Sequence, residues 1–110
     1  MGIDYASEKF TTAIYSILTS AVTESPQDRV YIAAMATRNL RPEDFTPVLW
    51  ERFAKFQIAV TRINDETKDS FRATADSLTA MEAHNLLVEF FNLANDVEEE
   101  YRVRYGQKGK

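Results

Sequence analysis

The apolar residues of this chain recur every three or four positions over long stretches, and this spacing limits the kinds of fold that the chain can adopt. In the first stretch, one face is formed by Phe10, Ala13, Ile14, Ile17, Leu18, Ala21 and Val22. In the last stretch, the same spacing joins Ala83, Leu86, Leu87, Phe90, Leu93, Ala94, Val97, Tyr101 and Tyr105. This period is that of an α-helix, whereas a half-buried strand would alternate. The sequence therefore predicts an all-α protein.

Proline residues and capping side chains mark where the helices should begin. Ser25-Pro26 and Thr46-Pro47 each place a hydroxyl at the N-cap and a proline in the first turn. Thr79 and Glu82 have the spacing of a capping box, and Gly106 follows the last apolar position. We expect a first helix capped by Asp4, then helices over residues 26–38, 47–64, 67–78 and 80–105.

Length and composition favour one compact unit. A chain of 110 residues with 45% hydrophobic residues can bury a core of its own. We expect residues 1–110 to form a single domain, an up-and-down bundle of four main helices and one short helix. The longest uncharged stretch, residues 10–23, is too short for a membrane span of about 20 residues. Since no secretory signal is recognisable either, we expect a cytoplasmic protein that does not bind membranes.

The residue types present exclude several kinds of site. The chain has no cysteine and one histidine, His84, so thiolate and multi-histidine metal sites and cysteine nucleophiles are excluded. Its net charge of −4 disfavours nucleic acid as a partner, because phosphate binding needs clustered positive charge. No glycine-rich phosphate loop and no Gly-x-Ser-x-Gly turn is present. We therefore predict a protein that is not an enzyme and holds no cofactor or metal.

Two predicted helical faces lack the charged side chains that solvated faces usually carry. The first helix has no charge between Lys9 and Glu24, and its back face carries Thr12, Ser16, Thr19 and Ser20. The third helix has a second apolar strip, roughly opposite its main one, at Trp50, Ala54 and Ile58. Because exposed uncharged patches often mark interfaces, we predict that both faces contact another protein chain.

The predicted function is thus protein–protein association without catalysis. We expect a small helical adaptor, regulator or accessory subunit that forms a homodimer. A further class stays open, because an apolar small-molecule pocket among Phe53, Phe56, Phe90 and Phe91 would leave no distinctive trace in the sequence.

A short segment before the last predicted helix points to an alternative function. Asp76-Ser77-Leu78 resembles the attachment motif of acyl carrier proteins, and Leu87, Glu89 and Phe91 fall where those carriers place Leu, Glu and Phe. The resemblance implies that Ser77 carries a phosphopantetheine arm at the start of an acidic helix. It covers a small part of the chain, and Thr74-Ala75 stands where the family usually has glycine.

His84 offers a second form of carrier chemistry. The segment His84-Asn85-Leu86 is similar, at its His and Leu, to the motif of histidine phosphotransfer domains. In that family a lone histidine on a helix of a small bundle accepts a phosphoryl group. Leu87 and Val88 replace the lysine and glycine of the family motif. The alternative function is therefore a carrier module modified at Ser77 or His84.

Overall fold

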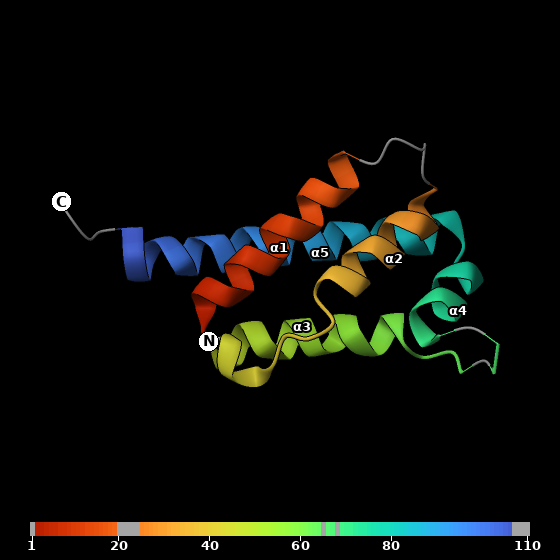
Figure 1. Ribbon diagram of the computed structural model, residues 1–110, viewed down its shortest axis with the longest axis horizontal. Helices are drawn as coiled ribbons and strands as arrows, with labels where there is room; N and C mark the ends of the chain where they lie inside the picture. Colours follow the sequence, from red (N-terminus) through yellow and green to blue (C-terminus); the bar gives the residue numbers. More distant parts are fainter. Residues whose placement is uncertain (1, 20–24, 65, 68, 107–110) are drawn as a thin grey trace.

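In the computed structural model, which describes residues 2–19, 25–64, 66–67 and 69–106, every regular element is helical (Figure 1). The elements are α1 (Ile3–Leu18), α2 (Pro26–Ala36), the 3-10 turn η1 (Pro42–Asp44), α3 (Pro47–Val60), α4 (Ser70–Ser77), α5 (Ala80–Tyr101) and the π-helical turn η2 (Arg102–Gly106). The predicted all-α bundle is confirmed. Within the described ranges, no helix is long and apolar enough to cross a bilayer.

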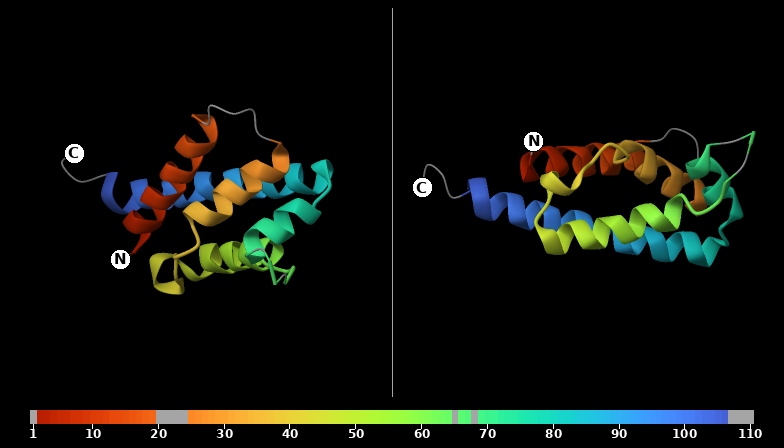
Figure 2. Two further views of the ribbon diagram at one scale, coloured as in Figure 1. Left: turned by 45° about the vertical axis from the view of Figure 1, so that its right-hand side comes forward. Right: turned by 90° about the horizontal axis from the view of Figure 1, so that it is seen from below.

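The bundle is organised around α5, its longest helix, which contacts α1, α2 and α3. Helices α3 and α5 lie side by side and run in opposite directions, and α1 and α2 lie over them (Figure 2). Helix α1 crosses α5 obliquely, while α4 packs against α2 at one end of the molecule (Figure 1).

The predicted caps of the second, third and last helices are confirmed. The side-chain oxygens of Ser25, Thr46 and Thr79 each accept a hydrogen bond from the backbone N–H three residues further on. In the last case the carboxylate of Glu82 also accepts the backbone N–H of Thr79, at 2.9 Å, which completes the capping box. These starts are predictable because each motif is local to one turn of chain.

The predicted cap of the first helix is wrong. The helix begins at Ile3 with Gly2 at the N-cap position, and Asp4 lies in the first turn. A distant carboxylate takes over the capping role, since the backbone N–H of Gly2 donates to Asp44 Oδ1 at 3.1 Å. Asp44 is buried, and its other oxygen accepts the N–H of Arg41 at 2.9 Å. The start of α1 is thus tied to η1 by a contact that no local pattern reveals.

The helices on either side of the α3–α4 loop are shorter than the sequence predicts. Helix α3 ends at Val60, and the hydroxyl of Thr61 donates to the carbonyl oxygen four residues earlier at 2.7 Å. Helix α4 begins only at Ser70, because Asp69 acts as its N-cap and accepts the backbone N–H of Arg72 at 2.8 Å. Both boundaries are set by side chains that bond to the backbone near helix ends.

Aromatic rings fill the centre of the bundle. Phe10, Phe53 and Phe90 are buried, and the ring of Phe90 lies 5.0 Å from that of Phe10 and 5.2 Å from that of Phe56, centre to centre. Phe91 lies on the outside of α5 and is partly exposed. Of the four phenylalanines considered for a small-molecule pocket, Phe53 and Phe90 are fully buried, and the rings of Phe56 and Phe91 each pack against Phe90. Among the described residues, Phe56 and Phe91 line different hollows, so the four do not line one cavity.

Candidate interaction surface

One exposed side of α5 carries no charged side chain for about four turns. Among its apolar members, Met81 is 68% exposed, Val88 42% and Phe91 40%. We call this strip the α5 face; it consists of Met81, His84, Asn85, Val88, Phe91, Asn92 and Asn95. Lys and Glu normally cover a solvated helical face, and large exposed apolar side chains in a row are typical of contact surfaces.

Beside the α5 face, α1 and α5 enclose a groove of about 500 Å³. It is lined by Ser7, Phe10, Thr11 and Ile14 of α1 and by Phe91, Asn92, Ala94, Asn95 and Glu98 of α5. At one end, the Ser7 hydroxyl donates to Glu98 Oε1 at 2.9 Å. The rest of the lining combines apolar side chains with the neutral amides of Asn92 and Asn95. Such a groove can receive apolar and hydrogen-bonding groups of a partner.

The last turn of α1 continues the uncharged surface. Tyr15 and Leu18 are exposed, and each lies one helical turn beyond a groove residue, Thr11 and Ile14 respectively. Figure 1 shows this end of α1 projecting past α5. We call the groove, Tyr15, Leu18 and the α5 face together the α1–α5 surface.

The hydroxyl residues predicted for an interface lie on the outer side of α1. Thr12 and Thr19 are exposed and Ser16 is half-buried, whereas Ser20 lies outside the described residues. The hydroxyl of Thr19 donates to the carbonyl oxygen of Tyr15 at 2.8 Å, so it adds a side-chain hydrogen bond to the backbone at the end of α1. Thr12 and Thr19 adjoin Tyr15 on the helix, next to the α1–α5 surface.

The strip predicted on α3 has two different environments. Trp50 is half-buried, and its ring packs at about 6 Å against Phe45 and Phe53, with centroid distances of 5.8 Å and 5.9 Å. Ala54 is half-buried too, but Ile58 is 69% exposed. Most of Trp50's contact area is thus used within its own chain, and Ile58 is the strip's open member.

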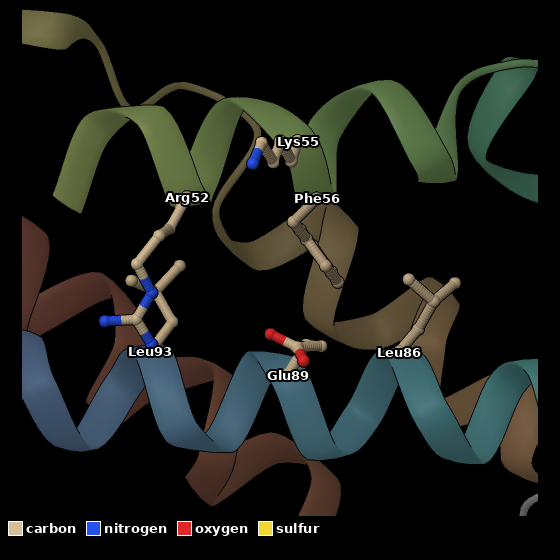
Figure 3. A pocket seen from close by; sticks show the side chains of 6 residues that line it. All are labelled: Arg52, Lys55, Phe56, Leu86, Glu89 and Leu93. Atoms are coloured by element: carbon tan, nitrogen blue, oxygen red, sulfur yellow. The ribbon is translucent and has the colours of Figure 1, made fainter. Parts of the chain in front are cut away.

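A second hollow, of about 370 Å³, lies between α3 and α5 (Figure 3). It is lined by Arg52, Lys55, Phe56, Leu86, Glu89 and Leu93. Arg52 reaches across to Asp96 at 2.6 Å, and Glu89 of α5 points toward α3 (Figure 3). The acidic side chains on this flank of α5 are therefore directed toward the cations of α3 and away from the α5 face.

The two residues of the carrier alternative lie on different elements. Ser77 is exposed and is the last residue of α4, where its hydroxyl donates to the carbonyl oxygen of Thr74 at 2.6 Å. The acyl carrier resemblance implies a serine at a helix start, but Thr79 occupies that position before α5. His84 is exposed and lies within the α5 face.

Comparison of this chain with protein-family models, with curated proteins and with solved structures found no match. What this chain does must therefore be inferred from its surface. Sequence reasoning missed Met81, Val88 and Phe91 as contact residues, although their spacing at i, i+7 and i+10 places them on one helical face with the neutral residues His84 and Asn85. Met81 and Val88 lie on the side of α5 opposite the buried Phe90 and Val97, and Phe91 lies at the edge of the groove that α5 forms with α1.

Proposed function

We propose that this chain is a non-catalytic protein–protein interaction module of the cytoplasm that docks a protein partner, including a second copy of itself, through the α1–α5 surface. The observation that carries the proposal is the α5 face, where three large apolar side chains are exposed without any charged neighbour in the strip. The adjoining groove supports it, because it offers recesses for side chains of the partner.

The energetics favour burial of this face. Full burial of one large apolar side chain contributes about 1.5–3 kcal/mol, and Met81, Val88 and Phe91 retain a substantial part of their exposure. Covering the three would contribute roughly 2–4 kcal/mol, and no charged group of the strip would have to be dehydrated. A charged face of the same size would lose much of this gain.

We propose that the two faces predicted from the sequence are further contact areas. Thr12 and Thr19 adjoin the α1–α5 surface, and Ser16 lies on the same helix. Trp50, Ala54 and Ile58 form a separate contact area on α3, in which Ile58 supplies the exposed apolar group. Substitutions on α1 and on α3 can be tested separately, because the two contact areas lie on different helices.

Site-specific photo-cross-linking tests the proposal. A photoreactive phenylalanine analogue replaces Phe91 in the chain, expressed in the organism that encodes it, and a matched variant carries the analogue at Val48. Val48 is 67% exposed on α3, outside both contact areas. We expect position 91 to form a covalent adduct with a protein, whereas position 48 forms none. Absence of any adduct from position 91 would contradict the proposed function.

The alternative proposal is a carrier module, and it is favoured by one observation, the exposure of both Ser77 and His84. Mass spectrometry of the protein isolated from its source tests this alternative. A phosphopantetheine arm on Ser77 would add about 340 Da, as expected for a covalently held group carrier. An unmodified mass in freshly isolated protein would count against the acyl carrier form, and analysis of acid-labile phosphate at His84 tests the other.

A further inference from the structure

We propose that the occupant of the α1–α5 surface is a second copy of this chain, related to the first by a two-fold axis. The inference rests on the proposed function, because it names the partner of the same surface. In such a pairing the same patch of both copies is in contact, so the patch must be complementary to itself. Two properties of the α1–α5 surface meet this requirement, and a third, its size, limits how tightly two copies can associate.

The first property is the distribution of charge. The chain has a net charge of −4, so two copies repel each other unless they meet through a neutral area. The α5 face is such an area. The neighbouring acids Glu89 and Asp96 are directed to α3, where Asp96 is paired with Arg52 at 2.6 Å. Glu98, the acid that lines the groove, accepts the Ser7 hydroxyl and lies 3.9 Å from Arg102. The α5 face itself contains no acidic group that would recognise a basic partner.

The second property is hydrogen-bonding capacity. Asn85, Asn92 and Asn95 are exposed on the α5 face, and among the described residues their side chains have no hydrogen-bond partner. Each amide carries both donors and an acceptor, so an amide of one copy can pair with an amide of the other in either direction. Identical neutral amides are therefore suited to a contact between identical surfaces, and they leave no charge unpaired on burial.

The third property is size. The α5 face is about 21 Å long, from a rise of about 1.5 Å per residue between Met81 and Asn95. With the groove and the end of α1, the surface still has fewer residues than the roughly 20–30 that each partner contributes to a stable interface. The area therefore fits a reversible dimer with a dissociation constant of roughly 10–100 µM and not a permanent one.

Analytical ultracentrifugation of the full chain tests the inference. From about 5 to 500 µM, a range that brackets the expected dissociation constant, we expect the average mass to rise from that of one chain to that of two. Val88→Asp introduces two like charges into the contact and should weaken dimerisation at least about tenfold. Val48→Asp is the matched control, with the same substitution at a more exposed valine of α3, and should leave dimerisation unchanged. Circular dichroism verifies that each variant is folded.

A second variant keeps the test decisive if Val88→Asp does not fold. Asn92→Lys replaces an exposed polar side chain of the same face and should weaken dimerisation in the same way. A monomer at all concentrations would overturn the inference, as would an equal loss of dimer with Val48→Asp. Loss of the dimer with Ile58→Asp but not with Val88→Asp would also overturn it and would assign the contact to α3.

The cross-linking experiment separates this inference from the proposed function. An adduct at position 91 with the mass of two chains supports both. An adduct with a different protein, together with a monomeric mass in the centrifuge, overturns the second copy as partner and leaves the interaction surface in place. No adduct and no dimer would overturn both.

Discussion

Arg72 is the side chain that ties α4 to α2, and its replacement by alanine should cost a measurable part of the stability. Its guanidinium donates to Asp28 Oδ1 of α2 at 2.9 Å and to Asp76 Oδ1 of its own helix at 2.8 Å. The same group lies 4.5 Å from the centre of the Tyr31 ring. One cation thus joins two carboxylates and an aromatic face on two helices that are far apart in sequence.

The magnitude follows from these three contacts. The side chain of Arg72 is 30% exposed and that of Asp28 is 37% exposed, so solvent screens the ion pair and it contributes about 0.5–1 kcal/mol. The pair with Asp76 is of the i,i+4 type and contributes about 0.3–0.5 kcal/mol, and the contact with Tyr31 about 0.5–1 kcal/mol. Arg72→Ala should therefore lower the free energy of unfolding by roughly 1.5–2.5 kcal/mol.

The loss of stability in Arg72→Ala should be smaller at acidic pH than at neutral pH. The hydrogen bond from Arg72 holds the pKa of Asp28 below its ordinary value of 3.8. A carboxylate whose pKa is lowered in the folded state stabilises the fold above its ordinary pKa, and this contribution is lost as the pH falls through the lowered value. The stability difference between wild type and Arg72→Ala should therefore be complete at neutral pH and shrink below about pH 4.

Urea unfolding, followed by circular dichroism at neutral pH and near pH 3, measures the difference. Lys55→Ala is the control, because it removes an exposed positive charge from another helix and should change stability by less than about 0.5 kcal/mol. A loss for Arg72→Ala no larger than that of the control, or a loss that is the same at both pH values, would refute the reasoning.

Three further substitutions probe the core, the buried carboxylate and a helix cap. Phe90→Ala removes a buried ring that contacts three others and should cost about 3–5 kcal/mol in urea unfolding. Asp44→Ala leaves the N–H groups of Gly2 and Arg41 without their acceptor and should lower the free energy of unfolding by about 2–3 kcal/mol. Faster amide hydrogen exchange at the start of α1 would locate the loss of stability there. Thr79→Ala removes one half of a capping box and should cost about 1 kcal/mol, with faster exchange confined to the first turn of α5; exchange that is unchanged there would contradict this role.

The sequence predicts those parts of the fold that depend on neighbouring residues. The caps at Ser25, Thr46 and Thr79 are correct because each involves a side chain and a backbone group three residues apart. The hydrogen bond from Gly2 to Asp44 joins residues 42 positions apart, so neighbouring residues do not indicate it. Local patterns predicted Asp4 as the cap instead, and this prediction was wrong. Contacts of that kind depend on how the helices are arranged, which no periodicity encodes.

The candidate surface was predictable only in part for the same reason. The absence of charge in α1 after Lys9 and the exposure of Ile58 could be inferred from the residue pattern along a single helix. The partial burial of Trp50 depends on Phe45 in the connection before α3, and the groove that Phe91 lines exists only because α1 packs beside α5. Residues on one helix face can be listed from the sequence, but which face stays uncovered is a property of the packing.

The contact between two copies can be located most directly by nuclear magnetic resonance of the ¹⁵N-labelled chain during dilution. Between about 500 and 20 µM, on either side of the expected dissociation constant, the backbone amide signals of Val88, Phe91 and Asn92 should move together with that of Leu18, while those of α3 stay in place. Concentration-dependent shifts that gather around Ile58, or spectra that do not change on dilution, would contradict self-association through α1 and α5.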